Sequence, residues 1–134
     1  MKQEVTTIKQ KVTILSVSPQ EVYEAYVDPR KHSEFTGSKT TGEPVVGGKY
    51  TAWDGYIFGK YLELDEGKRV VQEWTTTDWV EGYGPSKLEL SFAGVADGTE
   101  VCMVHSNVPK AKADEIAEGW IEFYWNPLKT YFKK

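Results

Sequence analysis

The C-terminal segment Lys112 to Phe132 places large apolar side chains at helical spacing, and it follows a long run of strand-like segments. At about 100° per residue from Trp120, most of its apolar residues fall within one arc. The arc contains Ile116, Phe123, Tyr124, Pro127, Leu128 and Tyr131. A helix of about 20 residues is about 30 Å long, enough to lie across a whole sheet. Pro127 lacks the amide that would bond to the carbonyl of Phe123, so a kink is expected there.

The middle of the chain alternates apolar and polar residues, as strands with one buried face do. The predicted strands cover residues 49–53, 56–64, 69–76, 86–92 and 99–106, with a weaker candidate at 42–46. Asp54-Gly55 and Asp97-Gly98 are two-residue hairpin signals because glycine tolerates positive φ. We therefore expect an antiparallel meander.

The N-terminal part begins with a further strand, in which Ile8, Val12 and Ile14 share one face. Two short helices should follow. Ser18, with Pro19 and Glu21 after it, forms the pattern of a capping box at the start of the first helix. Asp28 can cap a second helix that ends at Gly37. The predicted fold class is α+β: a curved antiparallel sheet of six or seven strands that packs against the long C-terminal helix and leaves room for a cavity.

Composition narrows the functional classes. The 134 residues, 40% of them hydrophobic, suit a single domain that spans residues 1–134. A net charge of −4 argues against nucleic acid or membrane partners. The lone Cys102 and the absence of a signal peptide or a long apolar run predict a cytoplasmic protein. We expect a monomer or a weak dimer.

The residue types that carry catalysis or bind metals do not cluster in this sequence. His32 and His105 are far apart, and Cys102 should point to the opposite face of its strand from His105. A zinc site needs three or four convergent ligands. The segment "GYIFGK" lacks the spacing and the Ser or Thr of a phosphate loop. We expect no metal, no cofactor and no catalytic residue.

Strand alternation places the polar residues Gln72 and His105 on the inner face of the sheet. Two accounts are open: these groups satisfy each other, a backbone group or water, or they orient a mostly apolar ligand. The aromatic residues divide in the same way between core and pocket lining. The expected ligand pocket consists of Trp53, Phe58, Gln72, Trp74, Met103, His105, Trp120, Tyr124 and Leu128.

Ile121 and Trp125 extend the apolar arc of the C-terminal helix beyond the side that faces the sheet. This stripe is wider than core packing alone requires. It could cover the first pair of helices or bind a protein partner, so both residues are candidates for a partner surface.

The stretches "GGKYTAWDGYIFGKYLELDEGKRVVQEWTTTDW", "GTEVCMVHSNVP" and "GWIEFYWNPLKTYF" resemble a known family, the activator of heat shock protein 90 ATPase homologues, C-terminal type. This family belongs to the START-like (SRPBCC) superfamily, and the similarity runs from about Val12 to the end of the chain. The resemblance implies a helix-grip fold with a cavity and implies no catalytic residues. Two-domain activators also carry an N-terminal domain that this sequence does not contain.

Three functions follow as expectations. The favoured one is a non-enzymatic START-like domain that binds a small hydrophobic ligand or a protein partner in or beside the cavity under the C-terminal helix. The alternative is a co-chaperone-like regulator of the heat shock protein 90 ATPase, with a chaperone as partner. The third is an aromatase/cyclase-like enzyme, for which the sequence offers no convincing acid-base pair.

Overall fold

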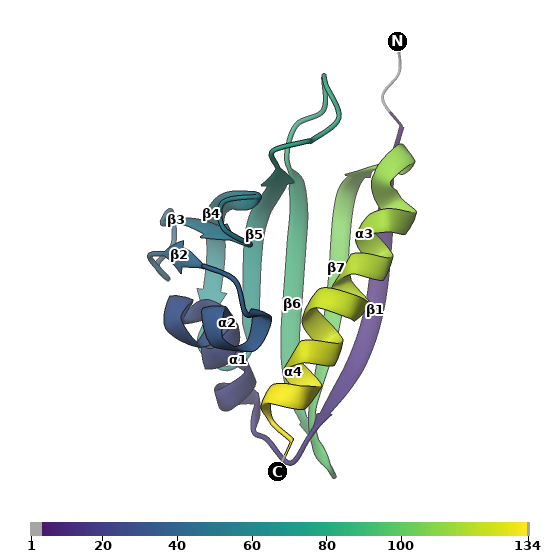
Figure 1. Ribbon diagram of the computed structural model, residues 1–134. Helices are drawn as coiled ribbons and strands as arrows, with labels where there is room; N and C mark the ends of the chain where they lie inside the picture. The colour runs from purple at the N-terminus through teal and green to yellow at the C-terminus, as the bar shows by residue number, and fades with distance from the viewer. Residues whose placement is uncertain (1–3, 134) are drawn as a thin grey trace.

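The computed structural model describes residues 4–133 and shows one antiparallel sheet covered on one side by helices (Figure 1). The sheet has seven strands in the order β1-β7-β6-β5-β4-β3-β2. The strands are β1 (Val5–Leu15), β2 (Thr41–Gly42), β3 (Lys49–Ala52), β4 (Ile57–Asp65), β5 (Arg69–Thr76), β6 (Ser86–Val95) and β7 (Gly98–Pro109). The predicted α+β helix-grip fold is confirmed.

Two short helices, α1 (Pro19–Val27) and α2 (Pro29–Thr36), follow β1 and begin at the caps that the sequence predicts. The Ser18 hydroxyl accepts a hydrogen bond from the Glu21 amide at 3.2 Å, and the Glu21 carboxylate accepts one from the Ser18 amide. The Asp28 carboxylate accepts from the Arg30 amide at 2.9 Å. Gly37, with φ of 74°, ends α2 in the left-handed region that favours glycine.

The two predicted hairpins differ in detail. Between β6 and β7, Val95 pairs with Gly98, so two residues form the turn, but they are Ala96 and Asp97 and not the predicted Asp97-Gly98. Between β3 and β4, Ala52 pairs with Ile57, so the loop covers residues 53–56 and is longer than predicted. Trp53 and Asp54 both have positive φ, 54° and 58°, before Gly55. This conformation is costly for a residue with a bulky side chain.

The C-terminal helix crosses the sheet over β7 and β1 (Figure 1). It is continuous, but its helix type changes along its length. It consists of the short 3₁₀ turn η1 (Lys110–Lys112), α3 (Ala113–Trp120), the π-helical turn η2 (Ile121–Trp125) and α4 (Asn126–Tyr131). The π turn stands just before Pro127, where the sequence predicts a kink. In it the Asn126 amide bonds to the Ile121 carbonyl, five residues back. A π turn takes about one more residue than an α turn, so each side chain is rotated less.

Candidate functional site

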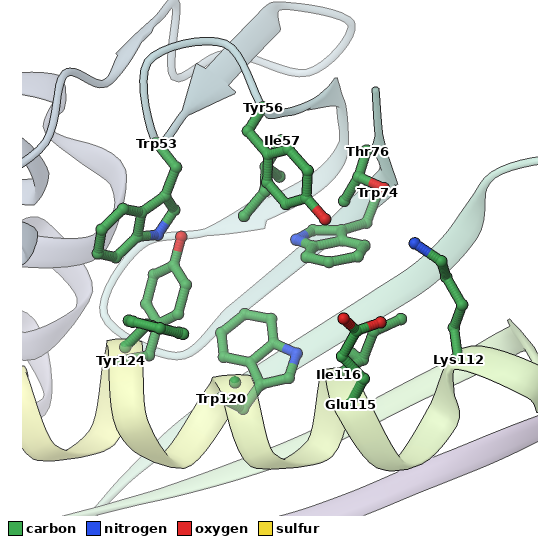
Figure 2. Close-up of a pocket in the computed structure, with 12 residues that line it drawn as sticks. Trp53, Tyr56, Ile57, Trp74, Thr76, Lys112, Glu115, Ile116, Trp120 and Tyr124 are labelled. Carbon is green, nitrogen blue, oxygen red and sulfur yellow. The ribbon is translucent and has the colours of Figure 1, made fainter. Parts of the chain in front are cut away.

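A cavity of about 430 Å³ lies between the C-terminal helix, the β3–β4 hairpin and β5 (Figure 2). Its volume is within the range of small-molecule sites. It is lined by Trp53, Tyr56, Ile57, Trp74, Thr76, Lys112, Glu115, Ile116, Gly119, Trp120, Phe123 and Tyr124. The sheet and the helix each supply one wall, so the cavity exists only in the folded chain.

Aromatic rings form most of the cavity wall. Trp120 and Tyr124 lie on the helix with ring centroids 4.4 Å apart. Trp74 of β5 lies 6.2 Å from Trp120, and Trp53 packs edge-on against Phe123 at 5.3 Å. Such pairs are held by ring electrostatics as well as by apolar burial. The wall is therefore mostly apolar, with the flat faces of several rings.

Polar groups gather at one end of the cavity, around Asp78 just outside it. The Asp78 carboxylate accepts hydrogen bonds from the Thr76 hydroxyl at 2.6 Å and the Tyr56 hydroxyl at 2.8 Å, and the Lys112 ammonium lies 3.1 Å away. The Thr76 bond, then those of Tyr56 and Lys112, lowers the pKa of Asp78 to about 2. Glu115 lies beside Lys112 at the same end (Figure 2).

His105 lies behind the aromatic wall with its hydrogen-bonding groups satisfied. The Trp120 indole N–H donates to His105 Nδ1 at 3.2 Å, so this nitrogen carries no proton. The neutral ring then donates from Nε2 to the Ser86 hydroxyl at 2.7 Å, and Ser86 donates to the Trp74 carbonyl at 2.8 Å. Burial lowers the pKa of His105 to about 3. The chain of bonds ties the helix to β5, β6 and β7.

A second buried network joins the helix to α1 and α2. His32 Nδ1 donates to the Tyr26 carbonyl at 2.8 Å, and His32 Nε2 accepts from the Tyr124 hydroxyl at 3.1 Å. Burial lowers the pKa of His32 to about 4, against the opposing effect of its bond to Tyr26. The Tyr26 hydroxyl donates to Gln72 Oε1 at 2.6 Å. Gln72 therefore has a protein partner.

The structure brings together part of the predicted pocket. Trp53, Trp74, Trp120 and Tyr124 line the cavity. The remaining predicted residues that are buried lie in the core without lining it: Gln72, Met103, His105 and Leu128. Gln72 and His105 are satisfied inside the protein, but their partners are the side chains of Tyr26, Ser86 and Trp120, not each other, a backbone group or water.

The expected pocket position of Phe58 is wrong, since its side chain is 40% exposed on the outer face of β4. Ile57 occupies the inward position instead. Strand alternation allows either phase, and the phase is fixed by the pairing of Ile57 with Ala52 across the 53–56 loop.

The expected surface position of Trp125 is also wrong, since only 4% of it is exposed. Its indole N–H donates to Gln10 Oε1 at 2.6 Å, and its ring stacks on Trp120. The smaller rotation per residue in the π turn brings Trp125 inward, which regular α-helical counting does not allow for. Ile121 is 49% exposed, as a partner surface requires.

Several lining residues were missed from the sequence. Tyr56, Ile57 and Thr76 reach the cavity because the β3–β4 loop folds over it, and Lys112, Glu115, Ile116 and Phe123 line it from the helix. The helical positions carried a signal, because Ile116 and Phe123 belong to the predicted apolar arc. Lys112 and Glu115 carried none, because charged residues at a helix start are ordinary solvated groups.

Residues 4–133 show neither a metal-binding cluster nor a membrane-spanning helix. Within that range no three His, Cys, Asp or Glu side chains come together in a way that could hold a metal ion. Within the same range no helix has the length and apolar character needed to cross a membrane.

The fold and its cavity define a START-like helix-grip protein, and comparison with known proteins gives the family. The model of the family described as activator of Hsp90 ATPase homolog 1-like protein matches residues 16–133, and the chain belongs to this family. The human activator of 90 kDa heat shock protein ATPase homolog 1 is 30% identical over 115 residues, which are 86% of this chain and 34% of the human protein. The chain thus spans about a third of the length of that relative.

Solved structures give the same fold. An HSP90 activator from Plasmodium falciparum superposes with a TM-score of 0.80 at 22% identity, over 95% of this chain and 94% of that one. The Aha1 dimer from Colwellia psychrerythraea gives a TM-score of 0.78 at 18% identity, over 96% of this chain and 99% of that one. At such identities the likeness concerns the fold alone.

Proposed function

We propose that this domain binds one small, mostly aromatic molecule in the cavity under the C-terminal helix and does not catalyse a reaction on it. The observation that carries the proposal is Gly119, which lies inside the helix and lines the cavity. Glycine in a helix interior costs about 1 kcal/mol relative to alanine. A Cβ placed there would meet nothing closer than the Phe123 ring at 3.8 Å, an ordinary contact.

Packing within the protein therefore does not require glycine at this position, and its effect is to keep the cavity open. Two further costly local features adjoin the same cavity: the left-handed conformation of Trp53 and the π turn that carries Phe123 and Tyr124. Departures from regular geometry concentrate at functional sites. Their coincidence at one cavity supports ligand binding there.

The two buried histidines support binding rather than catalysis. Both ring nitrogens of His105 and of His32 are engaged in buried hydrogen bonds. A general base must be able to reach the proton that it removes. Neither histidine lines the cavity, so neither meets that condition.

A thermal-shift screen of apolar aromatic compounds tests the proposal, because a ligand that binds only the folded state raises the melting temperature. Gly119→Leu should fill the floor of the cavity and abolish the shift. Glu118→Leu, on the exposed side of the same helix, is the matched control and should keep it. A screen without hits, or an undiminished shift in a folded Gly119→Leu variant, would contradict ligand binding in this cavity.

Regulation of an Hsp90-type chaperone is a second candidate function, which family membership favours. We propose Ile121 as its contact point, because this apolar side chain is half exposed on the helix. The direct test measures the ATPase rate of the Hsp90 from the same organism with and without the domain. Ile121→Glu should remove any stimulation without changing the melting temperature, and an unchanged ATPase rate with the natural domain would rule this candidate out.

A further inference from the structure

The polar end of the cavity restricts the chemistry of the ligand. We propose that the ligand is a neutral aromatic alcohol or phenol whose hydroxyl group lies between Lys112 and Glu115, an inference that rests on the proposed ligand-binding function. The rest of the molecule would lie among the rings of Trp53, Trp74, Trp120 and Tyr124.

The two ends of the cavity differ in character. Trp53 and Tyr124 lie at one end, and Lys112 and Glu115 lie at the other, with Thr76 nearby (Figure 2). Aromatic walls with a few polar groups at one end are typical of sites that orient a mostly apolar ligand. A flat ligand with one polar group therefore has a single favoured direction in this cavity.

The hydrogen bonds at the polar end leave both donors and acceptors for a ligand. The hydroxyl protons of Tyr56 and Thr76 are directed to Asp78, so their oxygens remain available as acceptors. The Glu115 carboxylate is an acceptor at the same end, and Lys112 has three ammonium protons, not all of which can point at Asp78. A ligand hydroxyl can donate to one of these acceptors and accept from Lys112.

Charge at this end disfavours the two common ionic alternatives. A ligand carboxylate would stand near Asp78 and Glu115, and the charge of Lys112 is already offset by Asp78 at 3.1 Å. A ligand ammonium would stand beside Lys112, whose side chain is only 17% exposed, so its charge is less screened by solvent. Glu115 is exposed, which weakens its attraction for a cation. A neutral hydroxyl meets neither repulsion.

The test compares four probes that share one apolar body: biphenyl, 4-phenylphenol, biphenyl-4-carboxylate and biphenyl-4-ylmethylammonium. Dissociation constants can be followed at pH 7 by quenching of tryptophan fluorescence. We expect 4-phenylphenol to bind about fivefold more tightly than biphenyl, as one net hydrogen bond implies, and more tightly than either ion. Tighter binding of the carboxylate or the ammonium would overturn the hydroxyl assignment and leave the cavity function standing. Failure of all four probes to bind would count against that function itself and the assignment with it.

Variants then locate the hydroxyl group. Lys112→Met and Glu115→Gln should each reduce the preference for 4-phenylphenol over biphenyl by about threefold, where the biphenyl affinity of the same variant is the reference for each ratio. Lys112→Arg, which keeps the charge and the donors, should restore most of the preference, and Glu118→Gln on the exposed face is the control. A preference that is the same in folded Lys112→Met and Glu115→Gln variants as in the natural chain would overturn the proposal.

Discussion

The two flanks of the C-terminal helix meet the sheet in different ways. On the flank toward β1, Trp125 stacks on Trp120 and donates to Gln10, and Gln10 in turn donates to the Ala117 carbonyl at 2.9 Å. On the flank toward the β3–β4 hairpin, Gly119 and the 45% exposed Phe123 border a cavity. One flank is closed and the other is open.

Both flanks are rich in aromatic residues, so aromatic content does not by itself distinguish a core from a binding site. On the closed flank a large side chain meets a polar partner that satisfies its indole N–H. On the open flank a glycine, Gly119, borders the cavity, and Trp53 and Asp54 of the opposing hairpin have left-handed backbone conformations. The difference lies in a few residues whose size and backbone geometry decide whether space is filled.

The largest test of this comparison is Trp125→Ala on the closed flank. Removing a buried tryptophan side chain should lower the free energy of unfolding by about 3 to 5 kcal/mol, because it leaves a void and an unpaired Gln10 oxygen. Urea denaturation of Trp125→Ala and Phe123→Ala gives the contrast. Phe123→Ala, on the open flank, should cost clearly less, and equal losses would remove the distinction between the flanks.

The second-largest expected effect is a loss of stability in acid, caused by the buried hydrogen-bond networks of His105 and His32. Both buried histidines have pKa values in the folded state below the ordinary 6.5, about 3 for His105 and about 4 for His32. The unfolded chain therefore takes up protons first as the pH falls. Stability is fully present above about pH 6.5 and falls by roughly 3 kcal/mol per pH unit between about 6 and 4 if both groups contribute.

Denaturation curves at pH 7, 6 and 5 measure this loss, and NMR of the imidazole protons shows where each ring titrates. If either histidine becomes protonated above about pH 5.5 in the folded protein, its ring is not buried and hydrogen-bonded in the neutral form as described. Ligand binding in the open flank should weaken only in step with the loss of folded protein.

The smallest expected effect is a gain in the free energy of unfolding. Gly119→Ala should raise the free energy of unfolding by about 1 kcal/mol, because the added methyl group meets no close neighbour. Thermal denaturation provides the measurement, with Ala117→Gly as the reverse change two positions earlier. A loss of stability in Gly119→Ala would mean that the cavity is already filled at that point and that the flanks do not differ.

Much of the fold was predictable because its signals are local. Ser18 and Asp28 cap the starts of α1 and α2, and the alternation of apolar and polar residues predicts the strands. Pro127 signalled an irregularity in the C-terminal helix, although the structure resolves it as a π turn before the proline. Each of these features depends on residues within one or two turns of each other.

The site was less predictable because it depends on contacts between distant segments. The inward position of Ile57 in place of Phe58 is set by strand pairing, and the burial of Trp125 depends on Gln10, 115 residues away in the chain. The partners of Gln72 and His105 come from α1 and β6, so a single strand pattern shows that they are buried and not what satisfies them.

The π turn also has a consequence for insertions and deletions. Its five residues, Ile121–Trp125, occupy a turn that a regular α-helix completes with about one residue fewer. A deletion of one residue, such as Glu122, is therefore expected to convert this stretch to ordinary α-helix while α4 keeps its orientation and Leu128 stays in the core. Deletion one turn later would instead rotate α4 by about 100°. Within this helix, the π turn is the place where chain length can vary most freely between relatives.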